Sequence, residues 1–161
     1  MMPWRARLLL VLLGTAAFLV PFLVGLIVEQ TRIRQWGDFG FAPEQTRKWW
    51  RNGISFRDEA IRWSAQGFGP DEAPEWKIME FIAQDAKEWK EAGFDVSGAA
   101  EWRRFAFSPS DAAHWVKGEF SLGDAVAWRK HGFGPRDAGP WRDKGYSPIT
   151  AADKKRAGKV P

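Results

Sequence analysis

Tryptophan recurs along this chain at a nearly constant interval. Every step of the series is thirteen residues, except the step between Trp49 and Trp63, which is fourteen. A fixed period is the sequence signature of a repeat protein, in which each unit buries its apolar face against its neighbours. The interval therefore predicts a repeat array. The series consists of Trp36, Trp49, Trp63, Trp76, Trp89, Trp102, Trp115, Trp128 and Trp141.

The residues between successive tryptophans follow one frame. Glycine commonly stands four residues after tryptophan, an aromatic residue follows it, and an alanine lies three residues before the next tryptophan. Ile54 replaces the aromatic residue in one unit. We expect the tryptophans and these aromatic side chains to form the structural core of the repeat. The aromatic positions are Phe41, Phe68, Phe81, Phe94, Phe107, Phe120, Phe133 and Tyr146.

The frame places the start and the end of a helix in every unit. In one unit Ser108 suits the N-cap, Pro109 suits the first helical position, and Asp111 can complete a capping box. The recurrent glycine suits the left-handed residue that ends a helix, labelled C′. Tryptophan then falls at C3 and the aromatic residue at C″, the two positions that touch in a Schellman motif. Each unit is therefore predicted to be one short helix.

These signals together predict an all-α fold. An N-terminal transmembrane helix is expected to continue into an α-solenoid of about nine short helices built from the 13-residue Trp/Gly-Phe/Ala repeat. Helices this short are unstable alone in water, so stacking of the units must supply the stability. The expected helices cover residues 43–52, 57–66, 70–79, 83–92, 96–105, 109–118, 122–131, 135–144 and 148–157.

Three units lack the corner glycine and carry Glu80, Ala106 or Glu119 instead. A residue with a Cβ atom is disfavoured in the left-handed region. We expect either a strained left-handed corner or a different corner geometry with a local change of curvature. In the third unit, Gly118 is one residue earlier and offers an alternative position for the turn.

An uncharged segment precedes the array. Residues 8–28 are 21 consecutive residues without a charged side chain, which is long enough to cross the hydrocarbon core of a bilayer. A cleavable signal peptide is the alternative, with Gly14-Thr15-Ala16 as the cleavage site. Cleavage there would leave twelve further apolar residues, which favours an uncleaved anchor. Pro21 predicts a mild kink in the span.

The anchor and the array are expected to form two regions without a flexible linker. Trp36 is already in phase with the repeat, so residues 1–42 are interpreted as the anchor and the first, elongated repeat helix. Residues 43–161 are interpreted as the repeat array. Lys154 and Lys159 stand where tryptophan and phenylalanine are expected, which is typical of a polar capping repeat, and the array is expected to end near Pro161.

The charge distribution argues against a nucleic-acid-binding protein. The whole chain has a formal net charge of +4, and residues 1–34 hold four arginines and one glutamate, so the array carries only about +1. The charge bias around the span is small, and the short N-terminus before a single anchor favours an array outside the cytoplasm. Basic residues near the span are candidate contacts with anionic headgroups. These are Arg32, Arg34, Arg47, Lys48 and Arg51.

The sequence predicts neither an enzyme nor a cofactor or metal site. The chain has two histidines, His114 and His131, which occupy different positions of the frame, and it has no cysteine. Its recurrent carboxylates fall in first helical turns, where helix capping and the helix dipole explain them.

The remaining features favour a binding protein. Repeat arrays chiefly offer binding surfaces, so we expect a scaffold or accessory subunit that assembles with another membrane protein or complex near the bilayer. Self-association into a homo-oligomer is left open. The alternative is extracytoplasmic binding of glycan or cell envelope by exposed aromatic side chains. Trp50, Phe39 and Phe105 lie outside the frame and are the candidate partner contacts.

Overall fold

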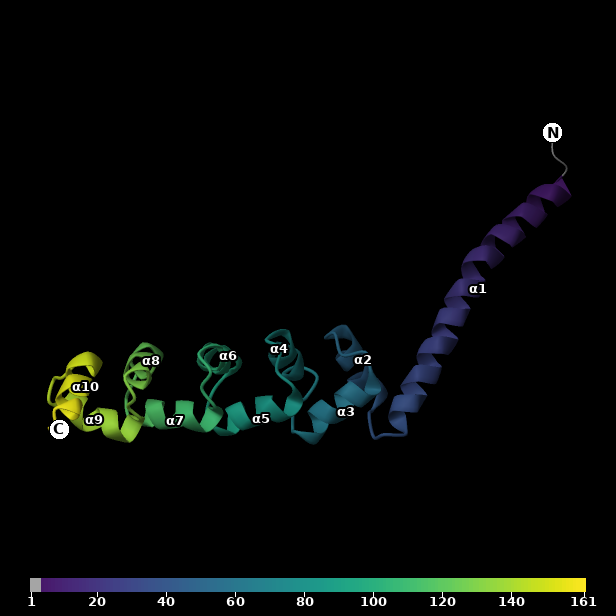
Figure 1. The fold of residues 1–161 in the computed structure, drawn as a ribbon. Helices are drawn as coiled ribbons and strands as arrows, with labels where there is room; N and C mark the ends of the chain where they lie inside the picture. The colour runs from purple at the N-terminus through teal and green to yellow at the C-terminus, as the bar shows by residue number, and fades with distance from the viewer. Residues whose placement is uncertain (1–3) are drawn as a thin grey trace. The chain divides into compact units, whose positions relative to one another are not determined.

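The protein is all-helical in the part of the chain that the structure describes. The computed structural model describes the backbone of residues 4–161 and the side chains of residues 19–161; the backbone forms ten helices and no strand (Figure 1). The helices are α1 (Trp4–Gly37), α2 (Pro43–Arg51), α3 (Arg57–Ala65), α4 (Ala73–Ile78), α5 (Ala83–Glu91), α6 (Val96–Arg104), α7 (Pro109–Lys117), α8 (Leu122–Lys130), α9 (Pro135–Asp143) and α10 (Pro148–Arg156).

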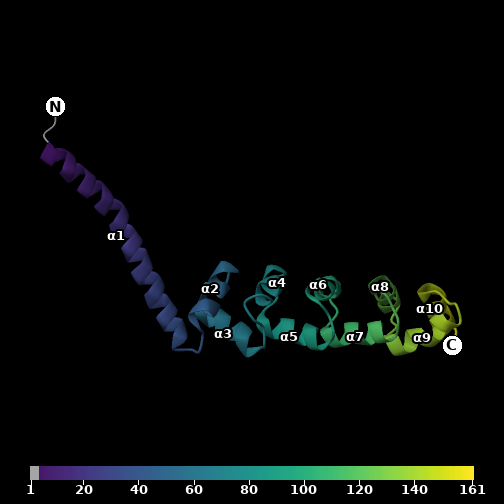
Figure 2. The ribbon, with the colours of Figure 1, turned by 180° about the vertical axis from the view of Figure 1, so that it is seen from behind.

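The helices belong to two compact units, Met1–Pro74 and Glu75–Pro161, whose boundary falls within α4. In the first unit, α1 packs against α2. In the second unit, each helix from α5 to α10 packs against the next one along the chain. There, α5, α7 and α9 follow one another in one row, and α6, α8 and α10 lie in a second row in both views (Figures 1 and 2). Within this second compact unit, consecutive helices of the 13-residue repeat therefore alternate between the two rows.

Helix α1 is the long helix of the fold. It contains 34 residues, includes Pro21, and ends one residue after Trp36. Among the described residues, no helix is long and apolar enough to cross a membrane. The predicted span of residues 8–28 begins within residues 4–18, whose side chains lie outside those described.

Side-chain caps occur at the starts of α6, α7, α8 and α10, whereas the N-cap residues of α2, α3, α5 and α9 make no side-chain cap bond. The Ser108 hydroxyl accepts the amide of Asp111 at 3.1 Å, and Ser121 and Asp124 form a complete capping box. Helix α4 is shorter than predicted, because it begins at Ala73 rather than at residue 70. Pro74 lacks the amide hydrogen that would bind the Pro70 carbonyl in a regular helix. That carbonyl instead accepts the Asn52 side-chain amide at 2.7 Å.

The corners between helices are Schellman motifs. From the corner after α1 to the corner after α9, the amide at C″ donates to the carbonyl of the tryptophan at distances of 2.9–3.3 Å. The amide at C′ donates to the carbonyl three residues earlier at 2.7–3.2 Å. These two bonds satisfy carbonyls that a helix end would leave without a partner. Sequence spacing alone therefore locates each corner.

The corners without glycine keep this geometry. Glu80, Ala106 and Glu119 have φ values of 60°, 56° and 61°, in the left-handed region. Of the two expected outcomes, the left-handed corner is confirmed and the different corner geometry is wrong. Gly118 does not take over the turn, since its φ is −80° and Glu119 adopts the left-handed conformation. The reason is that both Schellman bonds require the left-handed residue directly before the aromatic one.

Candidate interaction surface

The tryptophan ladder lies in the interior. Each of its nine side chains is at most 6% exposed. The frame alanines are also buried, and they let neighbouring helices approach the indole rings. They are Ala60, Ala73, Ala86, Ala99, Ala112, Ala125, Ala138 and Ala151. Stacking of a sugar on these indoles would require the repeat to open, so the ladder offers no row of free aromatic faces to a glycan.

Each corner from α1 to α9 brings one tryptophan against the following aromatic ring, except the corner at Gly53, where Ile54 replaces the aromatic residue. The ring centroids of these pairs are 4.9–5.6 Å apart and meet edge to face. Some aromatic residues also reach the next tryptophan: Phe94 lies 6.1 Å from Trp102, and Phe120 lies 6.3 Å from Trp128. One phenylalanine thus joins two consecutive helices. Such edge-to-face pairs contribute about 0.5–1.5 kcal/mol beyond their buried area.

Two aromatic residues of the frame and one polar residue depart from this pattern. Phe94 and Tyr146 are only half-buried, unlike the other frame phenylalanines. Thr46 stands where the frame has alanine, three residues before Trp49, and is fully buried. Neither the Thr46 hydroxyl nor the Trp49 indole nitrogen has a hydrogen-bond partner. The sequence spacing identified this slot, but the frame did not predict a polar residue in it.

Trp50 lies at the junction of α1 and α2. Its ring meets Trp36 edge to face at 5.7 Å, and the Arg32 guanidinium lies 4.6 Å from its centroid. The indole nitrogen is buried without a hydrogen-bond partner, although the residue is half-exposed overall. The structure therefore places Trp50 against α1, with part of its surface open to solvent. Its role as a partner contact stays a prediction.

The five basic residues near the predicted span have different surroundings. Arg47 pairs with Glu29 of α1 at 3.1 Å, and Lys48 pairs with Asp71 at 2.6 Å. Arg32 donates to the Ser55 carbonyl at 3.3 Å. Arg34 and Arg51 are exposed. Three of the five thus hold the first unit together, and contact of any of them with headgroups stays a prediction.

The other candidate contacts are exposed at corners. Phe39 is 53% exposed and carries the Arg57 guanidinium 4.0 Å from its ring centroid. Phe105 is 43% exposed at the C-cap of α6. Sequence reasoning missed further exposed apolar side chains near the glycine-free corners: Ile78, Met79, Ile82 and Val116. Their positions in the frame are variable, so no spacing signal marks them.

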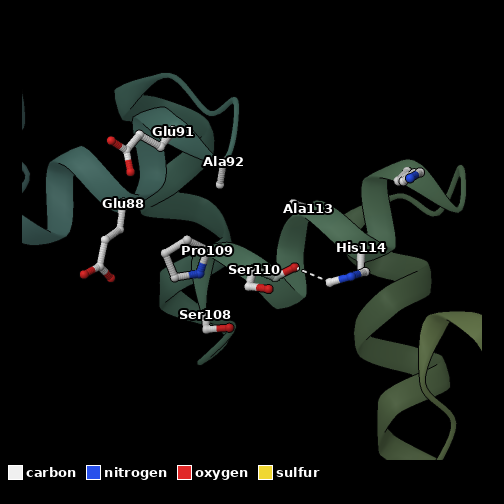
Figure 3. A pocket seen from close by; sticks show the side chains of 9 residues that line it. Glu88, Glu91, Ala92, Ser108, Pro109, Ser110, Ala113 and His114 are labelled. Atoms are coloured by element: carbon white, nitrogen blue, oxygen red, sulfur yellow. Dashed lines mark hydrogen bonds between the residues drawn. The ribbon is translucent and has the colours of Figure 1, made fainter.

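A surface groove of about 540 Å³ lies between α5 and α7 (Figure 3). Its walls carry Glu88, Glu91, Ala92, Ser108, Pro109, Ser110, Ala113, His114 and Lys117. His114 donates through Nδ1 to the Ser110 carbonyl at 2.7 Å, which ties the ring to its own helix. Glu88 accepts from Gln84 and Glu91 pairs with Lys87, so both carboxylates are held by α5 itself. The groove therefore brings together no nucleophile and base.

Metal ligands do not cluster in the described region. Among residues 19–161, no group of three or more histidine, aspartate or glutamate side chains is placed to hold a metal ion. Helix capping accounts for several of the carboxylates, including Asp95, Asp111 and Asp124.

Three arginines make contacts that sequence reasoning did not predict. Arg103, Arg129 and Arg142 lie in the last turns of α6, α8 and α9, where a basic side chain complements the helix dipole. In the structure each reaches back to a corner 23 or 24 residues earlier in the chain. The signal that could have found them is their shared position, one residue after a ladder tryptophan.

Comparison of the chain with protein-family models, curated proteins and solved structures found no match.

Proposed function

We propose that this chain is a membrane-anchored helical-repeat scaffold or accessory subunit, in which α1 carries the anchor and the array is an α-solenoid that assembles with another membrane protein. One observation carries the proposal. Helix α1 continues without a break from the uncharged segment to Trp36, which is buried as the first rung of the ladder. A helix that serves both regions would hold the array close to the bilayer. In this proposal the array lies outside the cytoplasm.

The contacts between α1 and α2 support a fixed connection. Ile33 and Trp36 of α1 are buried, and Glu29 and Arg32 are bound by residues of the following segment. An ion pair of this exposure contributes little alone, about 0–1 kcal/mol. Burial of the apolar side chains stabilises the junction more than the ion pair does. An anchor held in this way restricts the array to partners near the membrane surface.

Membrane association can be tested by alkaline extraction of membranes from cells that produce the full chain. The wild-type chain is expected to stay in the membrane pellet. Leu23→Arg combined with Val24→Arg should release it, because each arginine in a span costs about 2.5–3.5 kcal/mol of insertion free energy. Gln30→Arg combined with Gln35→Arg adds the same charge beyond the uncharged segment and should leave the chain in the pellet. Recovery of the wild-type chain in the soluble fraction would refute anchorage.

Assembly can be tested by purification in a mild detergent after crosslinking in intact cells. The chain is expected to co-purify with a membrane protein at a fixed ratio. Phe105→Ala should reduce that ratio with little change in the melting temperature, whereas Ile149→Ala, at a more exposed position (61% against 43%), should not change the ratio. Recovery of a lone monomer would contradict the scaffold. Self-association would give a homo-oligomer, and binding to envelope glycan in place of a protein would favour the alternative function.

A further inference from the structure

The three glycine-free corners share one tertiary contact. Arg103 donates to the carbonyl oxygens of Met79 and Glu80, the latter at 3.1 Å. The equivalent pairs are Arg129 with Phe105 and Ala106, and Arg142 with Gly118 and Glu119. In each case the acceptors are the carbonyls of the C-cap residue and of the left-handed residue after it. One guanidinium therefore spans the two peptide groups that define the corner.

The same guanidinium also covers the aromatic ring of the corner. The distances from Cζ to the ring centroid are 3.7 Å for Arg103 over Phe81, 3.6 Å for Arg129 over Phe107, and 4.3 Å for Arg142 over Phe120. A planar guanidinium can lie on a ring face while its N–H groups donate in the plane. The corner thus offers two acceptors and a ring face to one side chain, and arginine satisfies all three.

Arginine occupies this position only where the corner lacks glycine. The residue one after the ladder tryptophan, two helices further along, is an arginine for the corners at Glu80, Ala106 and Glu119. For the corners at Gly40, Gly53, Gly67, Gly93 and Gly132 it is Ser64, Lys77, Lys90, Val116 and Lys155. A general role in complementing the helix dipole would not depend on the identity of a residue two helices earlier. The match indicates a link between the arginine and the corner it contacts.

Backbone energetics explain the link. A residue with a Cβ atom favours the right-handed or extended region over the left-handed one, so a glycine-free corner has a tendency to relax. A change of the corner residue from the left-handed to the right-handed or extended region would rotate the two carbonyls of the corner away from each other. Simultaneous hydrogen bonds from one rigid guanidinium hold both carbonyls in place. A lysine ammonium lacks the planar fork and cannot hold them in the same manner.

We propose that Arg103, Arg129 and Arg142 are corner clamps: each stabilises a left-handed residue other than glycine and ties that corner to a helix two units further along the chain. The clamps link α6 to the corner before α5, α8 to the corner before α7, and α9 to the corner before α8. Through them, residues 79–142 gain tertiary contacts beyond those between consecutive helices. This segment then unfolds as one cooperative block.

A double-mutant cycle on the full chain in detergent tests the clamp, with unfolding followed by tryptophan fluorescence. Arg103→Met should lower the equilibrium constant for folding about tenfold, because it removes two charge-assisted bonds and a ring contact. In the Glu80→Gly background the same change should cost about threefold or less, since glycine needs no clamp. Arg104→Met removes an adjacent exposed arginine and should have no measurable effect. An equal loss from Arg103→Met in both backgrounds would overturn the proposal.

The corner at Gly93 allows the reverse experiment. Val116 occupies the clamp position there and is half-exposed. Gly93→Ala should lower the melting temperature, because the left-handed φ of 91° is retained with a Cβ atom. Val116→Arg should restore at least half of that loss, whereas Val116→Lys should restore little. If arginine and lysine restore the melting temperature equally, or neither does, the clamp is refuted. This readout is independent of membrane anchorage and of any partner.

Discussion

The ladder tryptophans of this chain are structural residues that help to end each helix. Each ladder tryptophan places its ring in the interior, and its own carbonyl accepts the C″ amide that closes the corner. The six residues from the tryptophan through the left-handed residue to the aromatic residue therefore form one structural motif. This is why the spacing of a single residue type predicted both the core and the helix ends.

Truncation of one rung should be costly. Trp102→Ala removes a buried ring that contacts both Phe94 and Phe107, and we expect a loss of about 3–5 kcal/mol in the free energy of unfolding. Chemical denaturation of the full chain in detergent measures it. Phe105→Ala, three residues later and partly exposed, should cost less than about 1 kcal/mol. Similar losses at both positions would contradict a buried ladder.

The glycines at the two ends of α8 have opposite effects on the stability of the fold. Gly132 ends the helix with a φ of +79°, so Gly132→Ala should destabilise the fold by about 1 kcal/mol although a Cβ atom there meets nothing within 4 Å. Gly123 lies in the first turn, where a Cβ atom has ordinary contacts, and Gly123→Ala should stabilise by about 0.5 kcal/mol. Melting temperatures that move in the same direction for both variants would rule out the conformational explanation.

At the level of the element, local signals determined most boundaries, and one failure shows their limit. The capping residues and the left-handed corner act within a few residues of the helix they delimit, so the sequence predicts them. Helix α4 begins later than expected, because Pro74, at the start of the second expected turn, frees the Pro70 carbonyl for the Asn52 side chain. That bond joins residues 18 positions apart, and no local signal predicts it.

The capping box of α8 provides a test at this scale. Ser121→Ala removes the hydroxyl that accepts the Asp124 amide at 3.1 Å, and it should cost about 1 kcal/mol of unfolding free energy. Ser97 lies inside α6 and is exposed, so Ser97→Ala should be neutral or slightly stabilising. The melting temperatures of the two variants, measured by thermal unfolding, test the capping role of Ser121. A capping role for Ser121 would be excluded if Ser97→Ala were the more destabilising change.

At the level of the molecule, the all-helical repeat was predictable and its tertiary contacts were not. The period predicts which side chains are buried, since these lie on the common frame. The clamp arginines and the junction around Trp50 involve variable positions that face solvent at some units and a neighbour at others. Which of these occurs depends on how the helices stack, and a single unit of sequence carries no information about that.

Stacking of the repeat helices should produce a gradient of protection from amide hydrogen exchange within Glu75–Pro161. Helices α6, α7 and α8 each pack against the helix before and the helix after them, whereas α10 packs against the helix before it, α9. Amide hydrogen exchange of the full chain, read by mass spectrometry, should therefore be slowest in α6–α8 and fastest in α10. Equal exchange rates in α7 and α10 would show that the contacts between consecutive helices do not determine local stability.

The hydrogen bonds from Arg103, Arg129 and Arg142 also bear on how the array can change length. Corner bonds lie within one unit, so recombination that duplicates or deletes a single unit leaves every corner intact. The arginine contacts reach 23 or 24 residues back. Insertion of one unit between Glu80 and Arg103 would bring the arginine to a different corner and leave Glu80 without its partner. Between residues 79 and 142, a change in the number of repeats would therefore separate these arginines from the corners that they contact.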